Sequence, residues 1–159
     1  MKKIYGIGLP RTGTTSLSSF LGCTHYCCIT SLERNDSQGQ KIIVDNSMYS
    51  SYKNLPVDSL FILTTRDKED WLNSINKFEN ISNDMPMVDK YLDEVTEYFA
   101  SINKTNNLLI INVFEETDIA KKLTKFLKSH DTKTTFPHIR VDEKRDNTIY
   151  WPPADGEMC

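Results

Sequence analysis

The chain of 159 residues suits one domain with a single core, and its hydrophobic share of 38% and charged share of 26% are typical of soluble globular proteins. A net charge of −3 argues against a general nucleic-acid-binding surface, so any cationic site must be local. No apolar run approaches the ~20 residues that span a bilayer. The apolar stretch after Lys2 and Lys3 is too short for a secretion signal, because Arg11 interrupts it. We therefore expect an intracellular, cytoplasmic protein with no membrane or nucleic-acid partner.

The first expected element is a strand at residues 3–9 that enters a Gly-rich turn and then a helix. Gly8 and Gly13 stand at the G-x-x-x-x-G spacing of a phosphate-binding loop. In loops that bind nucleoside triphosphates a Lys follows the second Gly, whereas here Thr14 follows it and Arg11 lies three positions earlier. Strand, turn and helix N-terminus together predict an anion cradle, because backbone N–H groups and the helix dipole point at one place. A chance glycine turn is the alternative.

Three of the four cysteines lie close together after this helix. With a histidine they form C-x-H-x-C-C, but the spacing matches no familiar zinc pattern and no second half follows. Buried thiols on a short strand at about 26–30 are favoured over a metal site, so we expect no metal. The residues concerned are Cys23, His25, Cys27 and Cys28, and the fourth cysteine is Cys159.

The later elements alternate between buried strands and amphipathic helices. This alternation predicts an α/β layered fold with a mainly parallel sheet. We expect one domain at residues 1–140 and an irregular polar tail at 141–159, while the segments 33–40 and 48–57 read as loops. The expected strands are 41–44, 59–65 and 107–114, and the expected helices are about 13–21, 68–78, 85–102 and 117–129.

Three notable features come directly after strands. They are the glycine turn, Asp45 and Arg66, and the carboxyl ends of parallel strands meet at one edge of a sheet. Arg66 follows the clearest buried strand, and Ser74 lies eight residues on, within the next helix. An Arg and a hydroxyl in this arrangement can hold a phosphate. The alternative for Arg66 is an ordinary surface ion pair with Asp67 or Asp70.

These motifs resemble those of P-loop sulfotransferases, which use 3′-phosphoadenosine-5′-phosphosulfate (PAPS). The segment Gly8–Leu17 looks like the family's 5′-phosphosulfate loop, which also lacks the kinase Lys and carries a Lys or Arg just after a Pro. Arg66, Trp71 and Ser74 resemble the family's 3′-phosphate segment. A softer likeness to a branch of small sulfotransferase-like proteins comes from Asn112-Val113 and Phe136-Pro137-His138. The resemblance covers most of residues 3–140 and implies a three-layer P-loop fold.

The resemblance also implies roles for individual residues. Arg11 and the loop would hold the 5′ phosphosulfate, and Arg66 and Ser74 would hold the 3′-phosphate that distinguishes PAPS from ATP. No metal is implied, because Arg11 and backbone N–H groups supply the charge stabilisation that Mg²⁺ supplies in kinases. The full donor-binding set is Pro10, Arg11, Thr12, Gly13, Thr14, Thr15, Ser16, Arg66 and Ser74.

The expected activity is transfer of a sulfuryl group from PAPS to an acceptor hydroxyl or amine, which leaves 3′,5′-adenosine bisphosphate (PAP). Arg11 would neutralise the leaving phosphate, and a general base near the acceptor is usual. Cytosolic members of the sulfotransferase family have a His at the strand end where this chain has Asp45. Asp45 is therefore the candidate base, and His25 is the other candidate. Asp45 would need a raised pKa, and a strand-end turn residue is its alternative reading.

Two other functions stay open from the sequence. One is a non-catalytic protein on the same fold that binds PAP or another nucleotide, which the short chain and its small acceptor region keep possible. The other is a nucleoside or nucleotide kinase, which the missing Lys and the lack of a clear Walker B acid disfavour. The basic tail residues Arg140, Lys144 and Arg145 carry no motif that fixes a phosphate contact, and the sequence defines neither the acceptor nor the oligomeric state.

Overall fold

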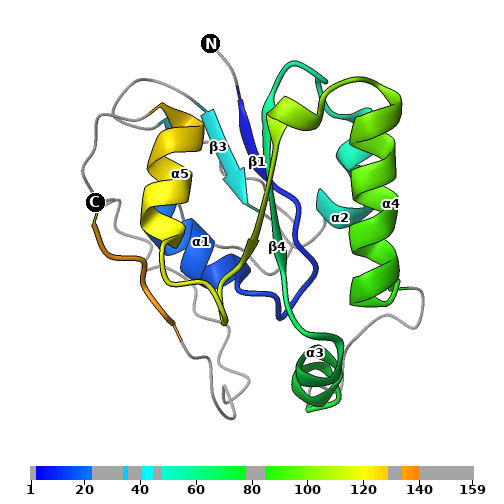
Figure 1. Cartoon of the computed structure of the whole chain (residues 1–159), viewed down its shortest axis with the longest axis vertical. Helices are drawn as coiled ribbons and strands as arrows, with labels where there is room; N and C mark the ends of the chain where they lie inside the picture. Colours follow the sequence, from blue (N-terminus) through cyan, green and yellow to red (C-terminus); the bar gives the residue numbers. More distant parts are fainter. Residues whose placement is uncertain are drawn as a thin grey trace, which may run out of the picture.

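The central element of the protein is a five-stranded sheet in the order β2-β3-β1-β4-β5 (Figure 1). The computed structural model describes residues 3–22, 34–35, 41–44, 48–77, 85–128 and 134–139. Strands β3, β1, β4 and β5 run parallel, and only β2 pairs antiparallel, with β3. The predicted α/β class with a mainly parallel sheet is confirmed. The strands are β1 Ile4–Gly6, β2 Arg34–Asn35, β3 Lys41–Val44, β4 Leu60–Thr65 and β5 Leu108–Asn112.

The helices follow the strands in the predicted alternation. All four predicted helices form, and those expected at 68–78 and 85–102 are up to three residues shorter at an end. The structure adds α2 and a 3-10 turn where a loop was expected, and it adds β2 inside the expected loop 33–40. The expected strand at 26–30 lies outside the described residues. The helices are α1 Thr14–Leu21, α2 Met48–Ser51, α3 Lys68–Ile75, α4 Val88–Ser101 and α5 Ile119–Leu127, with 3-10 turns η1 Tyr52–Asn54 and η2 Thr105–Asn107.

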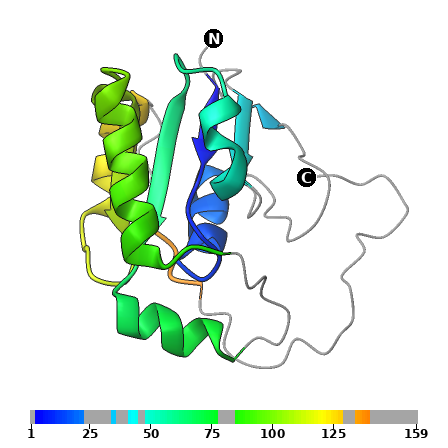
Figure 2. The ribbon, with the colours of Figure 1, turned by 90° about the vertical axis from the view of Figure 1, so that its right-hand side faces the viewer.

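Helices cover both faces of the sheet, so the described part of the chain forms three layers. Alternate residues of β4 point to opposite faces: Ile62 joins one hydrophobic cluster, and Phe61 and Leu63 join the other. The first cluster is covered by α1 and α5, and the second by α2, η1, α3 and α4. Figure 2 shows α4 and α2 in front of the sheet, with α1 and α5 behind it. No helix in the described ranges is long and apolar enough to cross a membrane.

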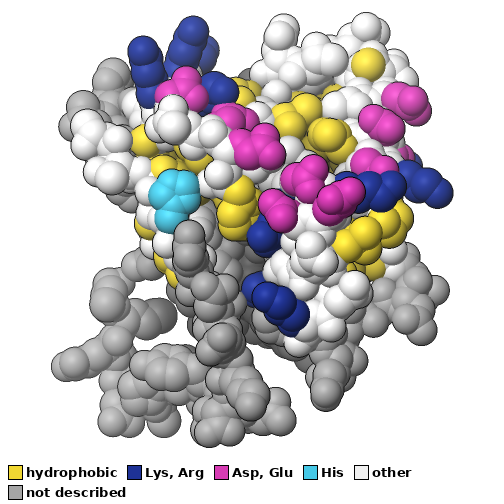
Figure 3. Space-filling view, turned by 60° about the horizontal axis from the view of Figure 1, so that its bottom comes forward, with side chains coloured by type: hydrophobic (Ala, Val, Ile, Leu, Met, Phe, Trp, Pro, Cys, Tyr) yellow, Lys and Arg dark blue, Asp and Glu magenta, His cyan; other side chains and the backbone are white. Residues whose placement is uncertain are grey.

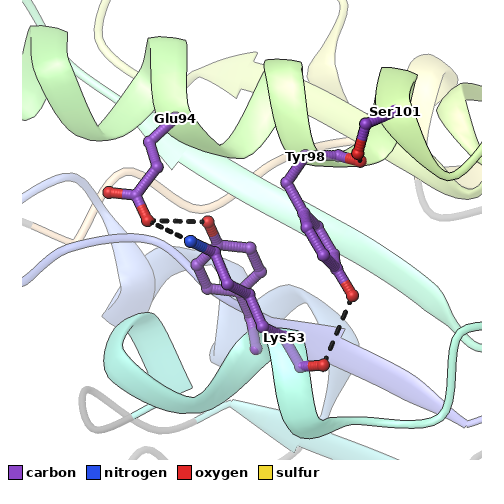
Figure 4. Close-up of polar contacts among 5 residues, drawn as sticks. Lys53, Glu94, Tyr98 and Ser101 are labelled. Carbon is purple, nitrogen blue, oxygen red and sulfur yellow. Dashed lines mark hydrogen bonds and ion pairs between the residues drawn. The ribbon is translucent and has the colours of Figure 1, made fainter.

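Polar contacts dock η1 on α4 (Figure 4). The carboxylate of Glu94 accepts from the Lys53 ammonium at 2.7 Å and from the Tyr52 hydroxyl at 3.3 Å. The Tyr98 hydroxyl donates to the Lys53 carbonyl at 3.3 Å. These contacts, with the edge-to-face packing of Tyr52 on Tyr91, hold α4 in place. Tyr91 of this helix also contacts the loop that follows β1.

Parallel pairing brings the carboxyl ends of the inner strands to one edge of the sheet. Gly6 at the end of β1 lies opposite Val44, the last residue of β3, and opposite Ile62 of β4. In Figure 1 this is the lower edge, where the loop that follows β1 lies beside the start of α3. The predicted meeting of the glycine turn with the end of β4 is therefore observed.

Candidate functional site

The two glycines of the loop are required by close contacts. A Cβ at Gly8 would overlap the Thr64 hydroxyl on β4, and a Cβ at Gly13 would overlap the side chain of Val113. Gly13 also has a φ of 98°, in the left-handed region that favours glycine. The G-x-x-x-x-G spacing is therefore set by packing against β4 and the end of β5, and it brings the loop into direct contact with both strands.

Arg11 joins the two motifs that the sequence predicted to act together. Its Nε donates to the Ser74 hydroxyl on α3 at 3.0 Å, and its carbonyl accepts from Arg66 Nη1 at 3.3 Å. Arg11 has a φ of 69°, which is uncommon for a residue with a side chain and costs on the order of 1 kcal/mol. Arg66 and Ser74 lie 55 and 63 positions after Arg11 in the sequence, yet the three residues form one cluster.

The carbonyl oxygens of the loop are held by donors from the protein. Trp71 Nε1 donates to the Pro10 carbonyl at 2.9 Å, and the Tyr91 hydroxyl donates to the Ile7 carbonyl at 2.7 Å. Burial raises the pKa of Tyr91, so its hydroxyl stays protonated and keeps donating. Carbonyl oxygens repel anions, and these contacts satisfy them within the protein. The loop can then serve an anion through its N–H groups and its Arg.

The hydroxyl groups of the loop divide between the interior and the helix start. Thr12 is fully buried, and its hydroxyl donates to the Leu9 carbonyl at 2.6 Å. The hydroxyl oxygens of Thr12 and Thr64 lie 2.7 Å apart. The N–H of Thr12 also bonds the Leu9 carbonyl, at 3.3 Å. The expected contact of Thr12 with a phosphate stays a prediction, and this geometry does not favour it. Thr14 is 4% exposed and Thr15 is half-buried at the first turn of α1.

Ser16 connects the helix start to the segment at 134–139. Its hydroxyl oxygen accepts from the N–H of Ile139 at 3.0 Å, and Phe136 of the same segment packs on Phe20 of α1 with ring centroids 5.4 Å apart. The hydroxyl proton of Ser16 can still be donated to a ligand. The predicted role of Ser16 in donor binding therefore stays open beside this structural role.

Arg66 has a second neighbour that the sequence analysis missed. Its guanidinium carbon lies 4.0 Å from the centroid of the Phe114 ring, and its Nε is buried and finds no hydrogen-bond partner among the described residues. Because Phe114 comes two residues after the end of β5, the rule that ligands bind at strand ends could have found it. Neither of the ion pairs considered for Arg66, with Asp67 or Asp70, is present; Asp67 instead caps α3.

The acceptor side of the predicted site lies outside the described residues. Asp45, the candidate base, follows the last residue of β3, and His25 belongs to the cysteine-rich segment; neither is described. The same holds for the basic tail residues Arg140, Lys144 and Arg145. Among the described residues no group of three or more His, Cys, Asp or Glu side chains could hold a metal ion.

Acidic side chains surround the described part of this edge. Figure 3 turns the edge toward the viewer and shows them gathered across it. The exposed acids of the elements that begin here are Asp67, Glu69 and Asp70 on α3 and Glu115 and Asp118 before α5. An anion must therefore be held by local donors and not by the general potential.

Comparison with known proteins adds no identification. None of the protein-family models matches this chain, and a search of curated proteins finds no relative.

Proposed function

We propose that the protein is a PAPS-dependent sulfotransferase. The observation that carries this proposal is the contact of Arg11 with both Ser74 and Arg66, which gathers two cations and a hydroxyl beside the N-terminus of α1. Such a cluster suits a nucleotide with phosphates at both its 5′ and 3′ positions, because each phosphate needs its own charged donors. The Lys with which kinases hold a triphosphate is absent, and Thr14 takes its place.

In this proposal the loop and the first turn of α1 hold the 5′ phosphosulfate. Arg66 and Ser74 hold the 3′-phosphate. During transfer the bond from sulfur to the bridging phosphate oxygen breaks, and a bond from sulfur to the acceptor oxygen or nitrogen forms. Arg11 neutralises the charge that develops on the leaving phosphate, and Asp45 takes the acceptor's proton. The products are PAP and the sulfated acceptor.

Calorimetry with PAP and with ATP tests the donor class. We expect PAP to bind without Mg²⁺ and more tightly than ATP, because ATP lacks the 3′-phosphate that Arg66 and Ser74 would hold. ATP binding that is equally tight and requires Mg²⁺ would overturn the proposal and favour a kinase. Arg11→Ala should reduce PAP affinity by at least about tenfold, the effect of losing one charge-assisted contact. Lys77→Ala is the matched control, since Lys77 is an exposed cation just after α3.

Transfer of labelled sulfate from PAPS to a panel of alcohols, phenols and amines tests catalysis separately. Product formation that depends on Arg11 and falls in Asp45→Asn supports the transferase. Tight binding of PAP with no transfer to any acceptor would favour the non-catalytic nucleotide-binding protein. Circular dichroism on each variant establishes that the fold is retained.

A further inference from the structure

We propose that Phe114 is a positioning residue that holds Arg66 ready for a nucleotide 3′-phosphate and so contributes to selection of a 3′-phosphorylated ligand. This inference rests on the proposed function. It concerns a residue that would act through Arg66, because the Phe114 ring lies against that guanidinium.

The first observation is the position of the guanidinium over the ring. Arg66 Cζ lies 4.0 Å from the ring centroid, within the range where a cation is attracted to an aromatic face. Arg side chains have many rotamers, and a flat aromatic surface restricts the guanidinium to orientations over it. Phe114 therefore limits the directions in which Arg66 can present its donors.

The second observation is that Phe114 is itself fixed in place. Its N–H donates to the Asn112 side-chain oxygen at 3.1 Å, and the Asn112 N–H donates to Glu116 Oε1 at 2.7 Å. Glu116 is held in turn by Lys122 at 2.6 Å. This turn at the end of β5 presents the ring at the sheet edge, although Phe114 is 50% exposed and belongs to neither hydrophobic cluster.

The third observation concerns the donors of Arg66. Nη1 donates to the Arg11 carbonyl, while Nε is buried and has no hydrogen-bond partner in the part of the chain that the structure describes. A buried donor without a partner is unfavourable and is often satisfied by an ion or water. An oxyanion accepting from this guanidinium would satisfy it. The Phe114 ring and the Arg11 carbonyl thus both contact a cation whose Nε has no hydrogen-bond partner among the described residues.

The test compares PAP with 5′-AMP, which lacks the 3′-phosphate, in calorimetry on four proteins and one control variant. These are the wild type, Phe114→Ala, Phe114→Leu and Phe114→Tyr. Phe114→Ala and Phe114→Leu should weaken PAP about fivefold, as expected for loss of a half-exposed cation–π contact, and should leave 5′-AMP unchanged. Phe114→Tyr keeps the ring and should retain the wild-type affinity. Val57→Ala, which removes another exposed apolar side chain, is the control.

A double-mutant cycle separates positioning from direct contact. If Phe114 acts through Arg66, Phe114→Ala should weaken PAP no further in an Arg66→Ala background. An equal loss for PAP and 5′-AMP would overturn the inference and indicate stacking on the base. Wild-type preference for PAP that survives in Phe114→Ala would overturn the inference alone. Wild-type protein with no preference for PAP over 5′-AMP would overturn the proposed function as well.

Discussion

Helices α1 and α3 both begin at the carboxyl edge of the sheet, yet their first turns are built in opposite ways. In α3, Asp67 caps the N–H groups of Glu69 and Asp70 at 2.9 and 3.1 Å, and those two acids complement the positive end of the dipole. In α1 the cap is Gly13, which has no side-chain oxygen to accept from the first N–H groups, and the first turn contains no acid.

The two helix starts therefore differ in the negative charge and the side-chain acceptors that the described residues supply to the first N–H groups. The start of α3 carries its own negative charge and its own acceptors, so an anion there would be repelled. At the start of α1 the cap residue makes no side-chain hydrogen bond and the first turn has no acid, and Arg11 precedes it, so an external anion is not repelled there as it would be at α3.

The largest effect is expected from Gly13→Ala. The new Cβ would overlap Val113 and force a side chain into a left-handed φ, at a cost of about 2–4 kcal/mol of unfolding free energy. Gly22→Ala is the matched control, because Gly22 has a φ of 70° but nothing within 4 Å of the added Cβ; it should lose only about 1 kcal/mol. Urea titrations measure both. Equal losses in the two variants would show that the contact with Val113 does not constrain the loop.

Thr15→Asp makes the start of α1 electrostatically similar to that of α3. The acid should leave unfolding stability unchanged or raise it by about 0.3–1 kcal/mol, through the helix dipole. It should weaken PAP by at least about fivefold, since two negative charges near 4 Å repel by about 1 to 4 kcal/mol. Calorimetry and thermal denaturation give the two readouts. Ser19→Asp, an exposed position on the same helix, should not change affinity, and undiminished PAP binding by Thr15→Asp would place the anion elsewhere.

Asp67→Ala tests the other side of the comparison. Loss of two cap hydrogen bonds should lower the unfolding free energy by about 1 kcal/mol, measured in urea. PAP affinity should stay the same or rise slightly, because a negative charge next to Arg66 is removed. Asp67→Asn retains a capping oxygen and should recover most of the stability. A large loss of nucleotide affinity in Asp67→Ala would mean that the start of α3 serves the ligand directly.

The sequence was sufficient for the features that depend on regular spacing. The glycine spacing predicted the loop, and the run at 59–65 predicted β4 within one residue, because a buried parallel strand is almost continuously apolar. The four-residue helix α2 and two-residue β2 were missed, because such short elements show no periodicity. The 3-10 turn η1 was missed for the same reason.

Side-chain direction in the site could not be predicted. Thr12 and Thr14 look equivalent in the sequence, yet the Thr12 hydroxyl turns inward to Leu9 and Thr64. Arg11 contacts Ser74 from a backbone with a left-handed φ, which could not be predicted from the residue type. Phe114 follows β5, at an edge where ligands bind, but a single aromatic residue in a turn has no spacing that singles it out before Arg66 is found over its ring.

The smallest effect is expected at the ion pair that ties the start of α3 to α4. Lys68 Nζ lies 2.7 Å from Asp89 Oδ2, and both side chains are nearly half exposed. The hydrogen bond from Lys68 lowers the pKa of Asp89 below its ordinary value of 3.8, so the pair stabilises the fold above that value and the contribution is lost as pH falls through the lower native pKa. Asp89→Asn should therefore melt slightly below the wild type at neutral pH and low salt.

That difference should shrink at an acidic pH below the lowered pKa of the Asp89 carboxyl, and it should also shrink at high salt because the pair is solvent-screened. PAP affinity should not change, since the start of α3 is complete without a ligand. A difference in melting temperature that is equal at both pH values would assign the effect to packing of α3 on α4 instead of charge. A change in PAP affinity would instead link the orientation of α3, and with it Ser74, to the anion site.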